Sequence, residues 1–77
     1  MPIGYVLISA ETGHTESVLA ELEKMDALEE AYMVYGTFDI VAKIKTDTMD
    51  KIKDAIIQVR LLGKVRSTQT MVVMGDT

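Results

Sequence analysis

The sequence predicts an α+β domain whose elements follow the order β-α-β-β-α-β. Three observations support this prediction. Four runs rich in strand-forming residues flank two segments with apolar residues at helical spacing, a glycine separates the two middle runs, and the chain of 77 residues has room for one small domain. Because two helices cover only one face of such a sheet, the other face is predicted to be free of helices.

The first strand is predicted over Ile3–Ala10 and the first helix over residues 14 to about 25. The strand is apolar at both alternating sets of positions, which is typical of a central strand covered on both faces. Apolar residues of the helix recur every three or four positions. Gly13 is the predicted N-cap, and Glu16 lies in the first turn, where a carboxylate suits the positive end of the helix dipole.

Two further strands are predicted over residues 29–35 and 38–45, joined by a turn at Gly36 and Thr37. A two-residue loop that begins with glycine favours a type II′ turn. One face of this hairpin is then wholly apolar. It carries Ala31, Met33, Tyr35, Phe38, Ile40, Ala42 and Ile44.

The turn also predicts the pairing register of the hairpin. Tyr32 lies opposite Val41, and Glu30 lies opposite Lys43 as a cross-strand ion pair. A slip of one residue would mix apolar and charged side chains on both faces, so the register is well specified.

The second helix is predicted to begin at a cap formed by Asp47 or Thr48 and to end before Gly63, placed as the C′ glycine. Its apolar stripe consists of Met49, Ile52, Ala55, Ile56, Val59 and Leu62. The last strand is predicted over residues 64–74. One set of alternate positions carries Thr68, Thr70, Val72 and Met74.

These elements predict a ferredoxin-like, antiparallel sheet of strand order 4-1-3-2 with both helices on one side. The helix-free face would expose Tyr32, Val34, Val41 and one of the two apolar sets of the first strand. Soluble monomers rarely leave such a patch open, and small domains without disulfides are marginally stable alone. We therefore predict a symmetric face-to-face sheet dimer of the dimeric α+β barrel type, burying at least about 1,200–2,000 Å².

Composition excludes several classes of function. Eight basic and twelve acidic residues give a net charge of −4, which leaves no large basic face for direct nucleic-acid binding. No apolar run is long enough to cross a membrane, and there is no signal peptide. The chain has no Cys and one His, so neither a metal site nor a cofactor is expected. These features together predict a cytoplasmic protein.

The predicted topology brings the turn and the starts of the third and fourth strands to one end of the sheet. This end offers backbone N–H groups, hydroxyls and one carboxylate beside apolar walls, a combination that suits a small zwitterion. Asp39 would bind the ammonium group, although it could instead tie down the hairpin or a subunit contact. The residues concerned are Gly36, Thr37, Phe38, Asp39, Ser67 and Thr68.

The same residues carry a family resemblance. The segments AYMVYGTFDIVAKI (residues 31–44) and GKVRSTQTMVVM (residues 63–74) resemble the effector-binding RAM domain of the Lrp/AsnC transcription regulators. The resemblance extends over nearly the whole chain. It includes the opening YVLI strand, the glycine before the first helix, a G-x-[FY]-D turn and a V-x-x-T-x-T closing strand.

This resemblance implies an oligomer that binds amino acids. Family members form face-to-face dimers that assemble into rings of four or five dimers, an octamer or a decamer, with effectors bound where dimers meet. The implied site uses Gly36, Thr37, Phe38 and Asp39 of one dimer, with Thr68 and Thr70 of a neighbour and Tyr32 or Tyr35 nearby. Thr37 stands where relatives often have an acidic residue, which leaves the preferred effector side chain open.

The resemblance also implies a stand-alone domain spanning residues 1–77. Lrp/AsnC regulators usually carry an N-terminal helix-turn-helix, whereas Met1 here stands just before the first strand. The expected partners are copies of this chain, an amino-acid effector and full-length Lrp/AsnC relatives, with neither direct nucleic-acid contact nor membrane contact.

Two alternatives to effector binding stay open at this point. One is a structural oligomerisation partner without an effector. The other is a monooxygenase-like enzyme of the small dimeric α+β barrel type, which would need a polar pocket between sheet and helices. No catalytic residues are expected, because no nucleophile–base pair or paired carboxylates occur. Arg60, Lys64 and Arg66 are expected to complement the helix dipole or pair with a neighbouring subunit's carboxylate rather than bind phosphate.

Overall fold

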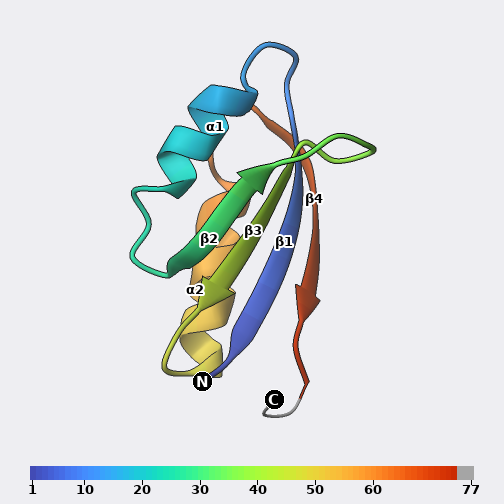
Figure 1. The fold of residues 1–77 in the computed structure, drawn as a ribbon. Coiled ribbons are helices and arrows are strands. Elements are labelled where there is room, and N and C mark those ends of the chain that lie inside the picture. Colours follow the sequence, from blue (N-terminus) through green and yellow to red (C-terminus); the bar gives the residue numbers. More distant parts are fainter. Residues whose placement is uncertain (75–77) are drawn as a thin grey trace.

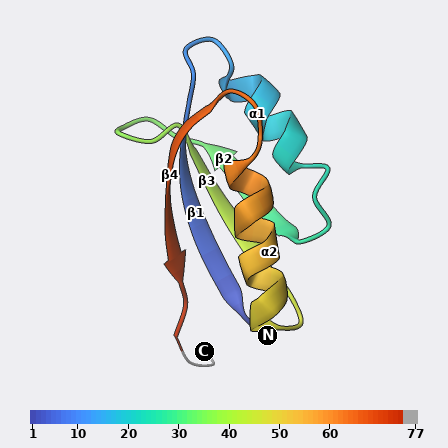
Figure 2. The same cartoon turned by 180° about the vertical axis from the view of Figure 1, so that it is seen from behind.

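The computed structural model describes residues 1–74 and confirms the predicted α+β fold (Figure 1). The elements are β1 (Ile3–Ala10), α1 (Thr15–Leu22), β2 (Leu28–Met33), β3 (Ile40–Lys45), α2 (Met49–Arg60) and β4 (Val65–Val72). The sheet is antiparallel throughout, in the order β2-β3-β1-β4, as predicted. Both helices lie on one face of the sheet, seen from the helix side in Figure 2, and no helix covers the other face within the described residues.

The hydrophobic core lies between the helices and the sheet. Along β1 and β3 every second residue is buried, which is the period-2 alternation of a strand with one fully covered face. Within residues 1–74 the only buried polar residue is Thr46. The core consists of Val6, Ile8, Ala10, Val18, Leu22, Ile40, Ala42, Ile44, Ile52, Ala55 and Val59.

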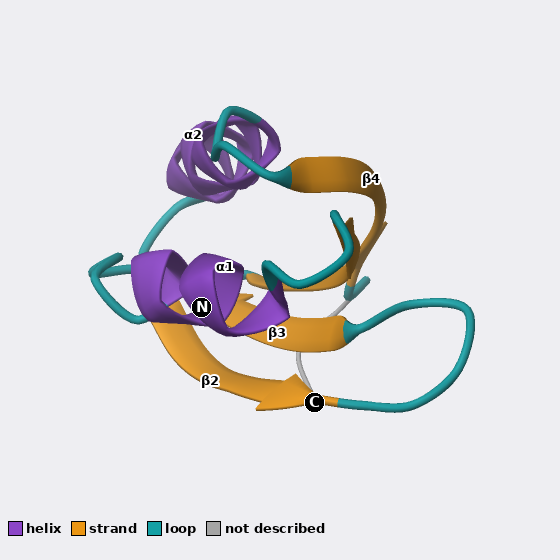
Figure 3. Ribbon diagram, turned by 90° about the horizontal axis from the view of Figure 1, so that it is seen from above, coloured by secondary structure: helices purple, strands orange, loops and turns teal. Residues whose placement is uncertain are grey.

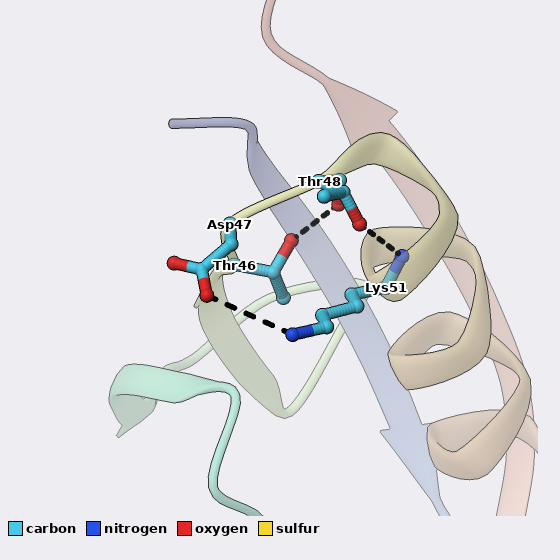
Figure 4. Close-up of polar contacts among 4 residues, drawn as sticks. All are labelled: Thr46, Asp47, Thr48 and Lys51. Carbon is cyan, nitrogen blue, oxygen red and sulfur yellow. Dashed lines mark hydrogen bonds and ion pairs between the residues drawn. The ribbon is translucent and has the colours of Figure 1, made fainter.

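The start of α2 confirms one of the two predicted caps (Figure 4). The Thr48 hydroxyl accepts a hydrogen bond from the backbone N–H of Lys51 at 3.3 Å, as an N-cap side chain should. Asp47 instead pairs with the Lys51 ammonium at 3.7 Å. The buried Thr46 hydroxyl donates to the Thr48 carbonyl at 2.7 Å, so its only polar group is satisfied.

The predicted limits of α1 were wrong at both ends. The helix begins at Thr15 with His14 as N-cap and ends at Leu22 rather than near residue 25. Gly13 lies one residue before the cap with φ of 82°, a left-handed conformation that glycine adopts without a Cβ clash. It therefore turns the chain into the helix instead of capping it.

The hairpin register is confirmed, but the predicted two-residue turn is wrong. Tyr32 pairs with Val41 and Glu30 with Lys43, as expected. The strands, however, stop at Met33 and resume at Ile40, so residues 34–39 form a loop that projects from the ends of β2 and β3 (Figure 3). No element covers this projection, and its tip cannot extend the apolar face of the hairpin. Tyr35, predicted on that face, is fully exposed.

The C-terminal end of α2 also differs from the prediction. The helix ends at Arg60 with Leu61 as C-cap, and the left-handed residue is Lys64 with φ of 72°, so Gly63 is not a C′ glycine. Met49, the first residue of α2, is 43% exposed because it precedes the turn that brings Ile52 onto the sheet. β4 is shorter at both ends than predicted.

The helix-free face carries the second apolar set of β1. Tyr5 and Leu7 are half-buried there, because Val6 and Ile8 face the helices. Paired positions share a face, so Val41, Tyr32 and the neighbouring β4 residues line the same surface. We call this surface, formed by Tyr5, Leu7, Tyr32, Val41 and Met71, the open face.

None of the described helices is long and apolar enough to cross a membrane.

Candidate functional site

Asp39 ties the loop between β2 and β3 to the end of β1. Its backbone N–H donates to the Ile8 carbonyl at 2.8 Å, and its Oδ2 accepts from the backbone N–H of Ala10 at 2.9 Å. Its carbonyl accepts from the N–H of Val34 at 2.8 Å, which closes the base of the loop. The carboxylate thus has a structural function, one of the two roles considered for it. Oδ1 makes no hydrogen bond to the described residues.

A surface pocket of about 370 Å³ opens beside this carboxylate. Its lining combines the Asp39 carboxylate and a hydroxyl with apolar side chains. The lining residues are Thr15, Met33, Val34, Tyr35 and Asp39.

Sequence reasoning found Tyr35 and Asp39 but missed Thr15, Met33 and Val34. Thr15 begins α1, and the hydrogen bond between Ala10 and Asp39 holds the nearby end of β1 against the loop. The turn glycine Gly13 was the available signal, because it returns the chain toward this end of the sheet. Met33 and Val34 were assigned to strand faces, since the turn was predicted too short.

The tip of the loop offers unpaired donors. Within the described residues, the backbone N–H groups of Gly36, Thr37 and Phe38 take part in no hydrogen bond. Gly36 has φ of 134°, a conformation that a residue with a Cβ rarely adopts. Successive backbone N–H groups without a partner can bind an anion.

The remaining candidate residues do not join this pocket within one chain. Ser67 and Thr68 line a separate pocket of about 260 Å³ at the start of β4. β1 separates β4 from β3, so two strand spacings, roughly 10 Å, lie between the two groups. Thr68 and Thr70 pair with Ile8 and Val6 on the helix-covered side.

Tyr32 lies on the open face and is 58% exposed. Within the described chain, the candidate residues are therefore divided between two separate pockets and the open face. Among residues 1–74, no group of three or more potential ligands among His, Cys, Asp and Glu is placed to hold a metal ion.

The known proteins that the chain resembles include regulatory proteins. The chain is 32% identical over 75 residues to the regulatory protein AsnC of Escherichia coli K12, covering 96% of this chain and 48% of AsnC. It spans about half the length of the curated relatives it matches.

Solved structures agree with the fold. The structure of FFRP-DM1 superposes with a TM-score of 0.91 at 29% identity, covering 96% of this chain and 100% of that one. The hypothetical protein PHS023 of Pyrococcus horikoshii superposes with a TM-score of 0.91 at 28% identity, covering 99% and 93% of the two chains. The family model for the Lrp/AsnC ligand binding domain matches residues 4–77. This chain therefore belongs to the Lrp/AsnC ligand-binding domain family, as its motifs implied.

Proposed function

We propose that this domain binds an amino-acid effector and, by oligomerising, modulates Lrp/AsnC-type transcription regulators or amino-acid metabolism without binding DNA itself. The observation that carries the proposal is the pocket in which the Asp39 carboxylate lies beside the loop with free N–H groups. Family membership supports the same function. The net charge of −4 argues against direct DNA contact.

The two ends of an amino acid match the two polar features of this site. The ammonium group would lie against the free Oδ1 of Asp39 and the hydroxyl of Thr15. The carboxylate would accept from the free N–H groups of Gly36 and Thr37. Met33, Val34 and Tyr35 form apolar walls against which an aliphatic side chain can pack.

The pocket is open in a single chain, and we propose that neighbouring copies close it. Domains of this family typically oligomerise. The open face would form the dimer, and dimers would assemble into octamer or decamer rings at the loops. A neighbour would then contribute Thr68 and Thr70, and Tyr32 would lie near the junction. An effector bound between dimers shifts the assembly by its preference for one quaternary state.

We also propose that residues 1–77 form a single ligand-binding and oligomerisation domain that acts in the cytoplasm, with copies of itself or with full-length relatives. FFRP-DM1 and PHS023 support this proposal, because this chain covers 100% and 93% of those solved chains. A domain of this size is thus sufficient to form the fold.

A thermal-shift screen with the common amino acids tests effector binding. A ligand that binds only the folded assembly raises the melting temperature, by an amount that grows with the ratio of its concentration to Kd. Absence of any shift at millimolar concentration would argue against an effector.

Asp39→Asn is the sharpest variant for this screen. The amide oxygen still accepts from the Ala10 N–H, so the loop stays anchored, while the charge that attracts the ammonium group is lost. We expect the shift to disappear and the oligomer to persist. A full response by this variant would show that Asp39 does not bind the ligand. Asp39→Ala is a poorer test, because it also removes the anchor.

A structural oligomerisation partner without an effector is the alternative, and one observation favours it: Asp39 Oδ2 is already bonded to Ala10. The monooxygenase-like alternative has less support. The helix-facing layer, where its pocket would lie, is filled by apolar side chains, with Thr46 the only buried polar residue described.

A further inference from the structure

Charge is unevenly distributed along this acidic chain. From Ala55 to Met74 there is no Asp or Glu, but there are three cations. They are Arg60, Lys64 and Arg66, and they bracket the turn between α2 and β4. On a surface that only keeps a protein soluble, positively and negatively charged side chains are usually interspersed.

Two of these cations, Arg60 and Arg66, line a pocket distinct from the one beside Asp39. The pocket has a volume of about 260 Å³ and is lined by Arg60, Val65, Arg66, Ser67 and Thr68. Two arginines thus line one cavity at the start of β4. Their guanidinium groups are hydrogen-bond donors, and no carboxylate lines the pocket.

The donors at this pocket have no side-chain partner within residues 1–74. The ion pairs among residues 1–74 join Lys24 to Glu21, Lys45 to Glu29 and Lys51 to Asp47, so neither arginine is neutralised. The side-chain hydrogen bonds of the described residues involve neither arginine and neither Ser67 nor Thr68.

Complementing the helix dipole accounts for only part of this charge. The C-terminus of α2 carries roughly half a negative charge, which Arg60 alone offsets. Lys64 and Arg66 are therefore in excess.

The backbone is irregular at two of these cations, Lys64 and Arg66. β4 has a bulge at Arg66, because Val65 pairs with Ala10 and Ser67 with Ser9, which leaves Arg66 without a partner. A bulge re-aims the side chain of the extra residue. Lys64 has φ of 72°, a conformation that costs about 1–2 kcal/mol for a residue with a Cβ. Gly63 next to it is not in that region, so the strain falls on the residue that carries the charge.

We propose that this pocket binds a phosphoryl dianion, either free phosphate or the end of a small phosphate monoester. Guanidinium groups bind such oxygens through paired N–H donors, and two arginines line this pocket. The pocket lies two strands from Asp39 of the same chain, so this site would act as a second ligand site of the domain. Thr68 lines it and is also proposed to reach a neighbour's Asp39 site, so the two ligands would bind close together in the assembly.

Titration of the full chain with inorganic phosphate at constant ionic strength tests the proposal. We expect saturable broadening of the phosphate signal in phosphorus NMR. Arg66→Gln and Arg60→Gln should each weaken binding by about tenfold or more, the loss expected for a charged hydrogen bond. Lys53→Gln is the matched control: it removes an exposed cation of α2 outside the pocket and should leave binding unchanged. Circular dichroism verifies that each variant is folded.

Phenyl phosphate serves as the second probe. Tighter binding than inorganic phosphate would assign a monoester, and equal binding would assign free phosphate; both support the site. Broadening without saturation, or an equal loss in Lys53→Gln, would overturn it. A change in sedimentation of the arginine variants without any phosphate binding would also overturn it, because the cations would then pair with carboxylates of a neighbouring copy.

Discussion

The two faces of the sheet are built from the same strands but end in different environments. Ile8 and Leu7 are neighbours in β1 and are both aliphatic, yet Ile8 is fully buried under the helices while Leu7 lies half-buried on the open face. On the open face Tyr32 is 58% and Met71 is 47% exposed. The strands supply apolar side chains to both faces, but the helices cover one.

The helix-covered face contributes to the folding of a single chain, whereas the open face is available for the assembly of several chains. The helix-covered face is complete within one chain, so its contribution to stability does not depend on protein concentration. The open face carries exposed apolar side chains, Tyr32 and Met71 among them, and contiguous patches of this kind often bind another molecule. Three variants test this division, and a fourth tests a turn outside both faces; they follow from the largest expected effect to the smallest.

Ile8→Ala tests the helix-covered face of the sheet. Loss of a fully buried isoleucine should lower the free energy of unfolding by about 3 kcal/mol, through lost burial and a residual cavity. Denaturant unfolding measures this effect. Leu7→Ala is the control from the other face, and its effect should vary with protein concentration. If the free energy of unfolding of both variants depends on protein concentration in the same way, the two faces do not differ as proposed.

The open face itself is tested by Val41→Lys. Val41 lies between Leu7 and Tyr32, near the middle of this surface, and a lysine there places unpaired charge in the proposed interface. We expect the dimer dissociation constant to rise at least about a hundredfold, as for an interface hot spot. Analytical ultracentrifugation measures it. A wild-type chain that sediments as a monomer at micromolar concentration would contradict the proposed dimer.

Thr48→Ala should lower the stability of the helix-covered side without affecting the open face. It removes the cap that accepts from the Lys51 N–H and should lower the free energy of unfolding by about 1 kcal/mol. The oligomer should be unchanged, because the cap lies away from the open face. Thr48→Ser keeps an accepting hydroxyl and should recover most of the loss. Thermal denaturation of the two variants makes the comparison.

The smallest expected effect concerns the turn that leads into β4, outside both faces. Lys64→Gly should raise the free energy of unfolding by about 0.5–1 kcal/mol, because glycine adopts the left-handed conformation without strain. Lys64→Ala removes the same charge but keeps the Cβ, so it should not stabilise the fold. Equal stabilisation by both variants would show that charge repulsion, rather than backbone strain, is relieved.

Much of the fold could be predicted from the sequence because hydrophobic periodicity specifies which residues face a core. The register of Tyr32 against Val41 followed from keeping the apolar residues of each strand on one face. Limits of the elements were predicted less well. Gly36 suggested a tight turn, but the hydrogen bonds of Asp39 to β1 hold the hairpin in a wider loop.

The candidate site was predicted only in part. The motif residues marked the loop, and Asp39 lies at its pocket. Thr15 escaped prediction because its proximity to Asp39 depends on how β1 turns into α1, and Gly13 was interpreted as a helix cap rather than as part of that turn. The pocket at Arg60 and Arg66 escaped for a similar reason: it lies beside a bulge in β4, which has no sequence signature.

The sequence by itself determined the element order, the pairing register, the apolar character of both sheet faces and the family, since these depend on side-chain type and spacing along the chain. The tertiary structure alone decided which apolar set of β1 lies under the helices, that one oxygen of Asp39 is already bonded, and that two arginines share an uncompensated pocket. Those outcomes depend on contacts between segments far apart in the chain, where geometry rather than composition selects the partner.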